Sequence, residues 1–218
     1  MISVSAHLAA ECANEIDAIR THPWVLGAAD GTLDDEAIGT WACQDIDWGD
    51  EFYAHVFAAA KSAPGLPAAT ADAFAWLQES IPPEVAWLNK MAAEYPVAAS
   101  GHELWPDFTG YGAWMLVTAQ KGPEEALTVL QACENSYHVA FTVVRDADPP
   151  VEWARWAGQN WAGPGFTQMM AWQAVGLDEY LAGVTSARRA ELVEVARGIY
   201  RWERRCFTSL TQRRGWDS

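Results

Sequence analysis

The chain has 218 residues, which is enough for one sizeable hydrophobic core, and we expect a single domain over residues 1–218. Its 14 Lys and Arg against 29 Asp and Glu give a formal net charge of -15, which argues against nucleic-acid binding, because affinity for phosphates needs clustered cations. No uncharged run approaches the roughly 18 residues of a membrane-spanning helix, and no leader pattern opens the chain, so we expect a cytoplasmic protein without membrane association.

The cysteines and tryptophans give the next indications. Cys12, Cys43, Cys133 and Cys206 are widely spaced and do not form the close pairs of a zinc or redox motif, so we expect free thiols. The 13 tryptophans exceed what a core of this size requires. Most should fill helix interfaces, and some should line a cavity where flat rings stack on a ligand.

Apolar residues recur at helical spacing in the first half of the chain. The pattern predicts a helix over residues 5–21 that stops before His22-Pro23, and a turn at residues 30–32. A long helix should begin near residues 33–35 and run to about residue 61. Another should span residues 69–95, where Pro82-Pro83 either kinks or divides it.

The second half continues the helical pattern. It predicts helices over residues 108–120, 123–145, 151–182 with an interruption at "AGPGF", and 186–213. Because no strand pattern or repeat is present, we expect an all-α, multi-helix bundle with any site buried between helices.

Helical phase places a carboxylate inside the long helix that starts near residue 33. Asp45 shares its side of the helix with Trp41 and Trp48. An inward carboxylate is costly unless something binds it, so Asp45 is a candidate site residue.

Two further helices carry interior candidates. Cys133 and Tyr137 lie on one stripe, whereas Glu134 and His138 lie about 100° and 140° round the helix from the thiol. On the last helix Glu203 is the acidic residue expected to be buried. Singly, each has a plain alternative, since a free cysteine is commonly a small core residue and a buried carboxylate often meets an arginine.

Three segments together resemble the TenA/thiaminase II family, of the heme-oxygenase-like superfamily. The first is "HPWVLGAADGTLDDEAIGTWACQD", with its His-Pro-aromatic and Gly-Thr-Leu turns and a helix that ends in Gln44-Asp45. The second is "ACENSY", which has a cysteine and, four residues later, a tyrosine. The third is "YRWERRCFTSLTQRRGW", in which Glu203 stands thirteen residues before Trp216.

The resemblance implies a heme-oxygenase-like fold, commonly a homotetramer, that cleaves the bond between an aminopyrimidine-methyl group and its leaving group in thiamin or its degradation products. It implies no metal and no organic cofactor. Carried over residue by residue, Cys133 would be the nucleophile, Asp45 would anchor the pyrimidine and Glu203 would act as acid/base. Tyr137 would orient thiol and substrate, and Tyr111 would be another pocket tyrosine.

The aromatic positions depart from the family pattern. Trp48 stands where the family usually has a tyrosine three residues after the aspartate, and Trp161 where a pocket tyrosine is expected. Tryptophan stacks but has no hydroxyl acceptor. With Trp41, these residues are candidates to bind a small heteroaromatic substrate.

Three other hypotheses are alternatives to a cysteine-dependent hydrolase. A metal-dependent oxidase could use the pairs Glu51/His55 and Glu134/His138, although helical phase sets both pairs apart from the Asp45 and Cys133 faces. A pyrimidine-binding regulator could keep the aromatic cavity without turnover. A third protein class would keep the thiol chemistry and act on a different heteroaromatic intermediate.

Overall fold

The computed structural model describes residues 3–216, and within these residues it contains helices and no strands. In chain order the helices are α1 (Val4–Glu11), α2 (Ala13–Arg20), α3 (Pro23–Asp30), α4 (Asp35–Trp48), the π-helical segment η1 (Gly49–Tyr53), α5 (Ala54–Lys61), α6 (Ala68–Glu94), α7 (Pro106–Ala119), α8 (Pro123–Ala147), α9 (Glu152–Ala162), α10 (Pro164–Tyr180) and α11 (Ser186–Gln212). The all-α prediction is confirmed.

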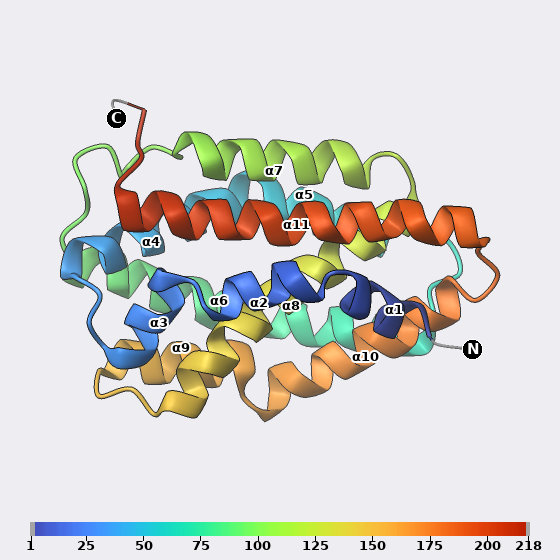
Figure 1. The fold of residues 1–218 in the computed structure, drawn as a ribbon, viewed down its shortest axis with the longest axis horizontal. Coiled ribbons are helices and arrows are strands. Elements are labelled where there is room, and N and C mark those ends of the chain that lie inside the picture. The colour runs from blue at the N-terminus through green and yellow to red at the C-terminus, as the bar shows by residue number, and fades with distance from the viewer. Residues whose placement is uncertain (1–2, 217–218) are drawn as a thin grey trace.

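Helix α8 forms the centre of the bundle. It packs against α3, α5, α7, α9, α10 and α11, and α7 lies alongside α11 on one side of the molecule (Figure 1). Alanine, valine and leucine side chains of α8 are buried on most of its circumference, because neighbouring helices cover it on several sides. Polar residues on α8 therefore lie deep in the protein.

The N-terminal region differs from the prediction. Residues 5–21 form two helices, α1 and α2, which meet at Cys12, and α3 was not expected at all. The His22-Pro23 pair does end the preceding helix, but it also starts the next one. His22 Nδ1 accepts a hydrogen bond from the Trp24 backbone N–H at 3.1 Å, and Pro23 occupies the first helical position, where it loses no hydrogen bond.

The long helix expected from residue 33 to 61 is present, with one irregularity. Asp34 caps its start by accepting a hydrogen bond from the Ala37 N–H at 2.8 Å. At Gly49–Tyr53 the helix widens into a π turn before continuing as α5. Such turns are rare and occur frequently at functional sites.

Pro82-Pro83 does not divide the helix that contains it. Helix α6 runs from Ala68 to Glu94 with both prolines inside. The expected break in residues 151–182 is confirmed at Gly163, between α9 and α10, and the last helix begins at Ser186 as expected.

Candidate functional site

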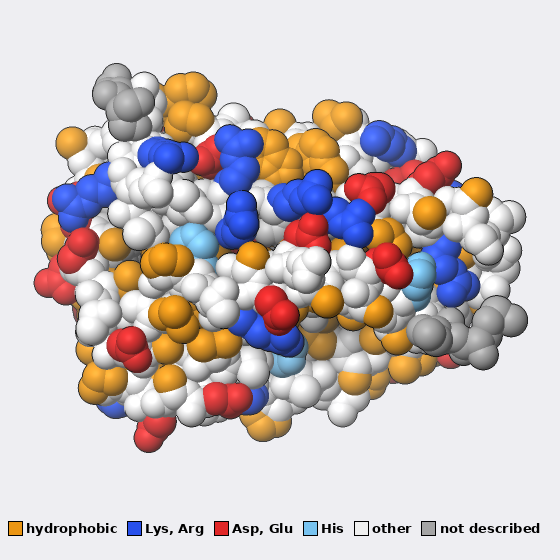
Figure 2. All heavy atoms as spheres, in the orientation of Figure 1, with side chains coloured by type: hydrophobic (Ala, Val, Ile, Leu, Met, Phe, Trp, Pro, Cys, Tyr) orange, Lys and Arg blue, Asp and Glu red, His pale blue; other side chains and the backbone are white. Residues whose placement is uncertain are grey.

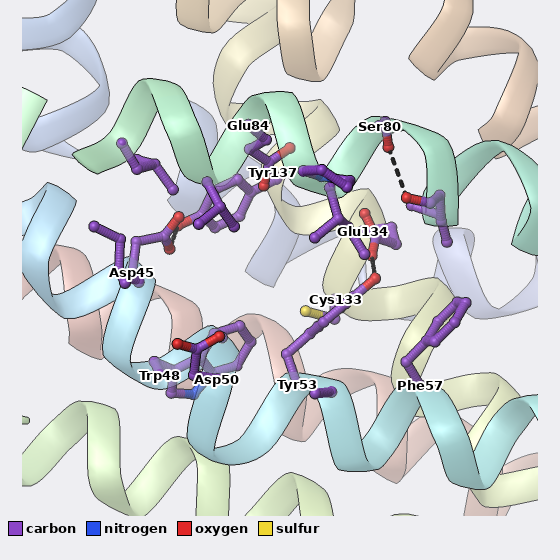
Figure 3. A pocket seen from close by; sticks show the side chains of 18 of the residues that line it. Asp45, Trp48, Asp50, Tyr53, Phe57, Ser80, Glu84, Cys133, Glu134 and Tyr137 are labelled. Carbon is purple, nitrogen blue, oxygen red and sulfur yellow. Dashed lines mark hydrogen bonds between the residues drawn. The ribbon is translucent and has the colours of Figure 1, made fainter. Parts of the chain in front are cut away.

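A cavity of about 350 Å³ opens between α4, η1, α5, α6, α8, α9 and α10. Most of its wall is apolar. Its polar wall residues are Asp45, Trp48, Asp50, Tyr53, Gln78, Ser80, Glu84, Cys133, Glu134 and Tyr137, and Figure 3 shows several of them around one space. The volume lies within the range of about 300 to 1,000 Å³ found for small-molecule sites.

Gln44 and Asp45 are neighbours with different roles: Gln44 holds the backbone in place, and Asp45 lines the cavity. Gln44 is fully buried, and its Nε2 donates to the carbonyls of Gly101 at 3.0 Å and Glu103 at 2.8 Å. Its Oε1 accepts from the Trp105 N–H at 2.7 Å. These bonds fix α4 to the loop before α7, and Asp45, one residue on, lines the cavity.

Asp45 is held by the tyrosine expected to work with the thiol. The Tyr137 hydroxyl donates a short hydrogen bond to Asp45 Oδ1, and Trp41 Nε1 donates to the same hydroxyl at 3.4 Å. Burial raises the pKa of Asp45 to about 6, and the Tyr137 hydrogen bond acts in the opposite direction. Trp41 is fully buried behind Tyr137 and does not line the cavity.

Cys133 lines the cavity one helical turn before Tyr137, as the sequence predicts. Burial, then the neighbouring Glu134 and Glu203, raise the pKa of the thiol well above its ordinary value, and Tyr111 acts in the opposite direction. The resting sulfur is therefore a neutral thiol, which needs a proton acceptor or a nearby cation before it can act as a nucleophile.

Glu203 and Tyr111 lie behind the thiol rather than in the cavity wall. Glu203 is 3% exposed, and its Oε2 lies 3.1 Å from Ser136 Oγ. Burial, then Asp45, raise the pKa of Glu203 to about 8, and Ser136 and Tyr111 act in the opposite direction. The Tyr111 ring stacks on Trp48 with centroids 5.1 Å apart. No pattern in the sequence pointed to Ser136.

Three carboxyl groups in the wall were not expected there, those of Asp50, Glu84 and Glu134. Glu134 accepts a short hydrogen bond from the Tyr53 hydroxyl, and Glu84 accepts one from Asn160 Nδ2 at 2.9 Å. Burial is the main cause that raises the pKa of Glu134 to about 7 and that of Glu84 to about 8. Phase on α8 wrongly set Glu134 apart from the Cys133 side.

Of the three tryptophans predicted to bind substrate, two line the cavity and one, Trp41, lies behind it. Trp48 and Trp161 both line the cavity, so the two departures from the family pattern face the site. The Trp161 ring meets Tyr137 edge-on at 5.3 Å and lies 4.6 Å from Phe141. These contacts fix the orientation of the ring that a bound ligand would meet.

The Glu/His pairs considered for a metal do not converge. His55 is exposed and lies outside the cavity wall, and His138 Nδ1 lies 3.1 Å from the Trp161 carbonyl. Among residues 3–216, no group of three or more His, Cys, Asp or Glu side chains is arranged to hold a metal ion. Over the same range, no helix has the length and apolar character to cross a membrane.

The arrangement combines a buried thiol, a carboxyl-tyrosine pair on one side of it and aromatic walls. A flat heteroaromatic ring can stack in such a space while Asp45 fixes its polar edge. Buried carboxyls with pKa values of about 6 to 8 can both give and take protons near neutral pH.

The fold resembles those of several solved structures. A TenA homologue from P. horikoshii OT3 has a TM-score of 0.81 at 18% identity, covering 97% of this chain and 99% of its own. A putative TenA-like thiaminase from Sulfolobus solfataricus has a TM-score of 0.75 at 13% identity, covering 99% of each chain. A TenA family transcription regulator from Silicibacter has a TM-score of 0.79 at 15% identity, covering 95% of this chain and 96% of its own.

At these identities the likeness to solved structures shows the fold alone. A search of curated proteins gave no match. The sequence profile of the TENA/THI-4/PQQC family, however, matches residues 10–212, which is nearly the whole chain and includes each of the site residues described above. The chain belongs to the TENA/THI-4/PQQC family.

Proposed function

We propose that this protein is a cysteine-dependent hydrolase that cleaves the bond between an aminopyrimidine-methyl group and its leaving group. The observation that carries the proposal is that the Cys133 thiol and the Asp45-Tyr137 pair line one cavity of about 350 Å³. The thiol is the nucleophile that the reaction needs, and the pair offers a fixed acceptor for the amino group of the ring.

The substrate would bind with its ring between aromatic walls. Trp48 and Trp161 supply flat faces for stacking, and Asp45 accepts hydrogen bonds from the exocyclic amino group or a protonated ring nitrogen. Tyr137 keeps the Asp45 carboxyl in place. This would hold the ring above the sulfur in a single orientation.

The reaction would then proceed by addition and elimination. The sulfur adds to an electron-poor ring carbon, the thiol proton leaves to a base and a ring nitrogen gains a proton. The ring electrons expel the leaving group from the exocyclic methylene, and an amine leaving group takes up a proton as it departs. Water adds to that carbon and loses a proton, the ring nitrogen releases the proton that it gained, and the sulfur departs with its bonding pair. Glu203, buried near Cys133, would take and return the thiol proton.

Turnover of thiamin and of the aminomethyl aminopyrimidine tests the proposal. Wild-type protein should form hydroxymethylpyrimidine, with ammonia released from the amine. Cys133→Ser should lose at least about 100-fold in rate, because serine is a far weaker nucleophile at neutral pH. Cys43→Ser is the matched control, since Cys43 is a partly exposed thiol outside the cavity wall, and it should keep the wild-type rate.

A binding protein without turnover is the second candidate. The buried, neutral thiol and the tryptophans at the two departing positions favour it. Hydroxymethylpyrimidine that stabilises the folded protein against heat, with no turnover of either substrate, would identify such a protein and overturn the hydrolase. Turnover that is lost in Cys133→Ser and kept in Cys43→Ser would overturn the binding protein instead.

A further inference from the structure

The charged side chains that line the cavity are all acidic. Four of the wall residues are acidic, namely Asp45, Asp50, Glu84 and Glu134, and none of the lining residues is Lys, Arg or His. A ligand with a phosphate or carboxylate would bring negative charge to this wall without a cation to meet it. The cavity therefore suits a neutral or positively charged ligand.

Two of the acidic groups are not needed to hold a pyrimidine. Asp45 is engaged by Tyr137, whereas Glu134 comes from the next residue after Cys133 and is oriented by Tyr53 of η1. In Figure 3, the Glu134 carboxyl and the end of the Tyr53 side chain meet to the right of Cys133, whereas Asp45 lies to its left. The wall thus has a second polar region, separate from the Asp45-Tyr137 pair.

Glu84 adds a further carboxyl to the cavity wall, from another helix. It extends from α6 and is held by Asn160 of α9 at 2.9 Å. The charge of Asp45 raises the pKa of both Glu84 and Glu134, and the charge of Glu134 adds a smaller effect on Glu84. Two carboxyls fixed by neutral donors, from separate helices, form a preorganised acceptor for one cation.

We propose that Glu84 and Glu134, oriented by Asn160 and Tyr53, select substrates whose leaving group is positively charged, such as a thiazolium ring or an ammonium group. The proposal rests on the proposed function, because it assigns the aminopyrimidine to Asp45 and the leaving group to this second region. It makes Glu84 and Glu134 the residues that determine specificity for the leaving group.

Binding should be linked to proton release. With the cavity empty, the pKa values of about 8 for Glu84 and about 7 for Glu134 leave much of the pair protonated at neutral pH. A cation favours the ionised carboxylates, so its affinity should rise with pH between about 6 and 8. The other titratable groups around the pair are Asp45 on α4, Asp50 and Tyr53 on η1, Cys133 and Tyr137 on α8, and Glu203 on α11.

Affinities for a matched cation and neutral ligand test the proposal. Thiamin is compared with its isostere that carries a neutral thiophene in place of the thiazolium, at several pH values, in a Cys133→Ser background that prevents turnover. Thiamin should bind roughly tenfold more tightly at pH 8, since one charge-assisted contact is worth about 1.5 to 3 kcal/mol, and only its affinity should rise with pH. Glu84→Gln and Glu134→Gln should each bring the ratio toward one.

Glu79→Gln is the matched control, because Glu79 is an exposed residue of α6 outside the cavity wall. An unchanged thiamin-to-isostere ratio in both cavity variants, or an equal loss for both ligands, would overturn the proposal. Binding of hydroxymethylpyrimidine, which lacks the leaving group, should stay within about twofold in the variants.

The two proposals fail in different ways. Absence of turnover by wild-type protein counts against the hydrolase, but the ratio of the affinities for thiamin and its neutral isostere can still be measured. If the wild-type protein does not bind hydroxymethylpyrimidine, the same ratio is measured with an N-methylthiazolium and its neutral thiazole. A ratio of one for that pair would overturn the cation selection as well.

Discussion

Ser136 affects the candidate site through a neighbouring carboxyl. Its Oγ lies 3.1 Å from Glu203 Oε2 and 2.7 Å from the Cys133 carbonyl, so it joins the helix that carries the thiol to the helix that carries the acid. The hydroxyl lowers the pKa of Glu203, against the larger effect of burial. Ser136 is a positioning residue rather than one that touches substrate.

Ser136→Ala should therefore raise the pKa of Glu203 above its value of about 8. Because Glu203 has to be ionised to take the thiol proton, the rise of kcat/KM on the acid side of the profile should move to higher pH. The full pH profile of the rate measures this. Ser209→Ala is the control, because the buried Ser209 hydroxyl bonds the Cys206 carbonyl at 2.8 Å on the same helix as Glu203. A uniform loss of rate with an unmoved inflection would show a purely structural role.

At the scale of elements, the π turn η1 changes the helical phase between the first and second parts of the long helix, and so affects which of its side chains face the cavity. It separates Asp45 and Trp48 before it from Phe57 after it, and Tyr53 at its end meets Glu134. Phe52, inside the turn, is buried against α7 at Gly112. A Cβ on Gly112 would lie 2.1 Å from the Phe52 ring, so only glycine allows this approach.

Gly112→Ala should destabilise the protein by about 1 to 3 kcal/mol, because Phe52 has to move out of a packed contact. Since Phe52 lies next to Tyr53, the variant should also weaken binding of cationic ligands. Gly49→Ala is the paired control: no atom lies within 4 Å of its Cβ position, so it should be neutral or stabilising by up to about 1 kcal/mol. Equal denaturation midpoints for the two variants would contradict this account of η1.

The same segment shows what helical periodicity can and cannot predict. The span of residues 33–61 followed from apolar spacing and the acidic start at Asp34, which are local signals. The π turn was not predicted. Phe52, inside it, packs closely against Gly112, a residue far away in sequence, and apolar spacing along one helix carries no information about such a contact. Helix α3 had a local signal that was not used, a proline at its first position and Gly31 at its end.

The site was predicted in part for similar reasons. Asp45, Cys133 and Tyr137 could be predicted, because helical spacing and the resemblance indicated the same helix faces, and all three line the cavity wall. Glu134 was not predicted as a site residue, because only the side chains on the same face of α8 as Cys133 were expected to reach the site. The cavity contacts a wider part of the helix surface, which includes the next residue after Cys133. Glu84 follows directly after Pro82-Pro83, where an uncertain helix gave no phase to argue from.

At the scale of the whole molecule, cations and buried acids are kept apart. Figure 2 shows basic side chains gathered on the face where α11 lies. Arg197 contacts Glu15 and Glu194 there, and Arg205 contacts Asp107 at 2.7 Å. Arg197 and Arg205 of α11 thus meet carboxylates outside the cavity, while the carboxyls of the cavity face no cation among its lining residues.

This separation makes the folded state lose stability as pH rises. The pKa of Asp45 is raised to about 6, that of Glu134 to about 7, and those of Glu84 and Glu203 to about 8, from ordinary values of 3.8 and 4.5. Between those ordinary and raised values the folded protein holds more protons than the unfolded chain. The free energy of unfolding must then decrease with pH.

The decrease should be clearest from pH 7 to 8.5, above the range in which His22, with its pKa lowered to about 4, changes the balance in the other direction. Each carboxyl still protonated in the folded state contributes a fall of at most about 1.4 kcal/mol per pH unit. Glu203→Gln removes one such group, so denaturation midpoints of that variant should depend less on pH than those of wild type. Glu191→Gln, at a side chain 65% exposed on the same helix, should keep the wild-type slope. Parallel slopes for wild type and Glu203→Gln would mean that Glu203 is already ionised in the folded protein across this pH range, and would contradict the raised pKa on which the expected pH profile of the reaction depends.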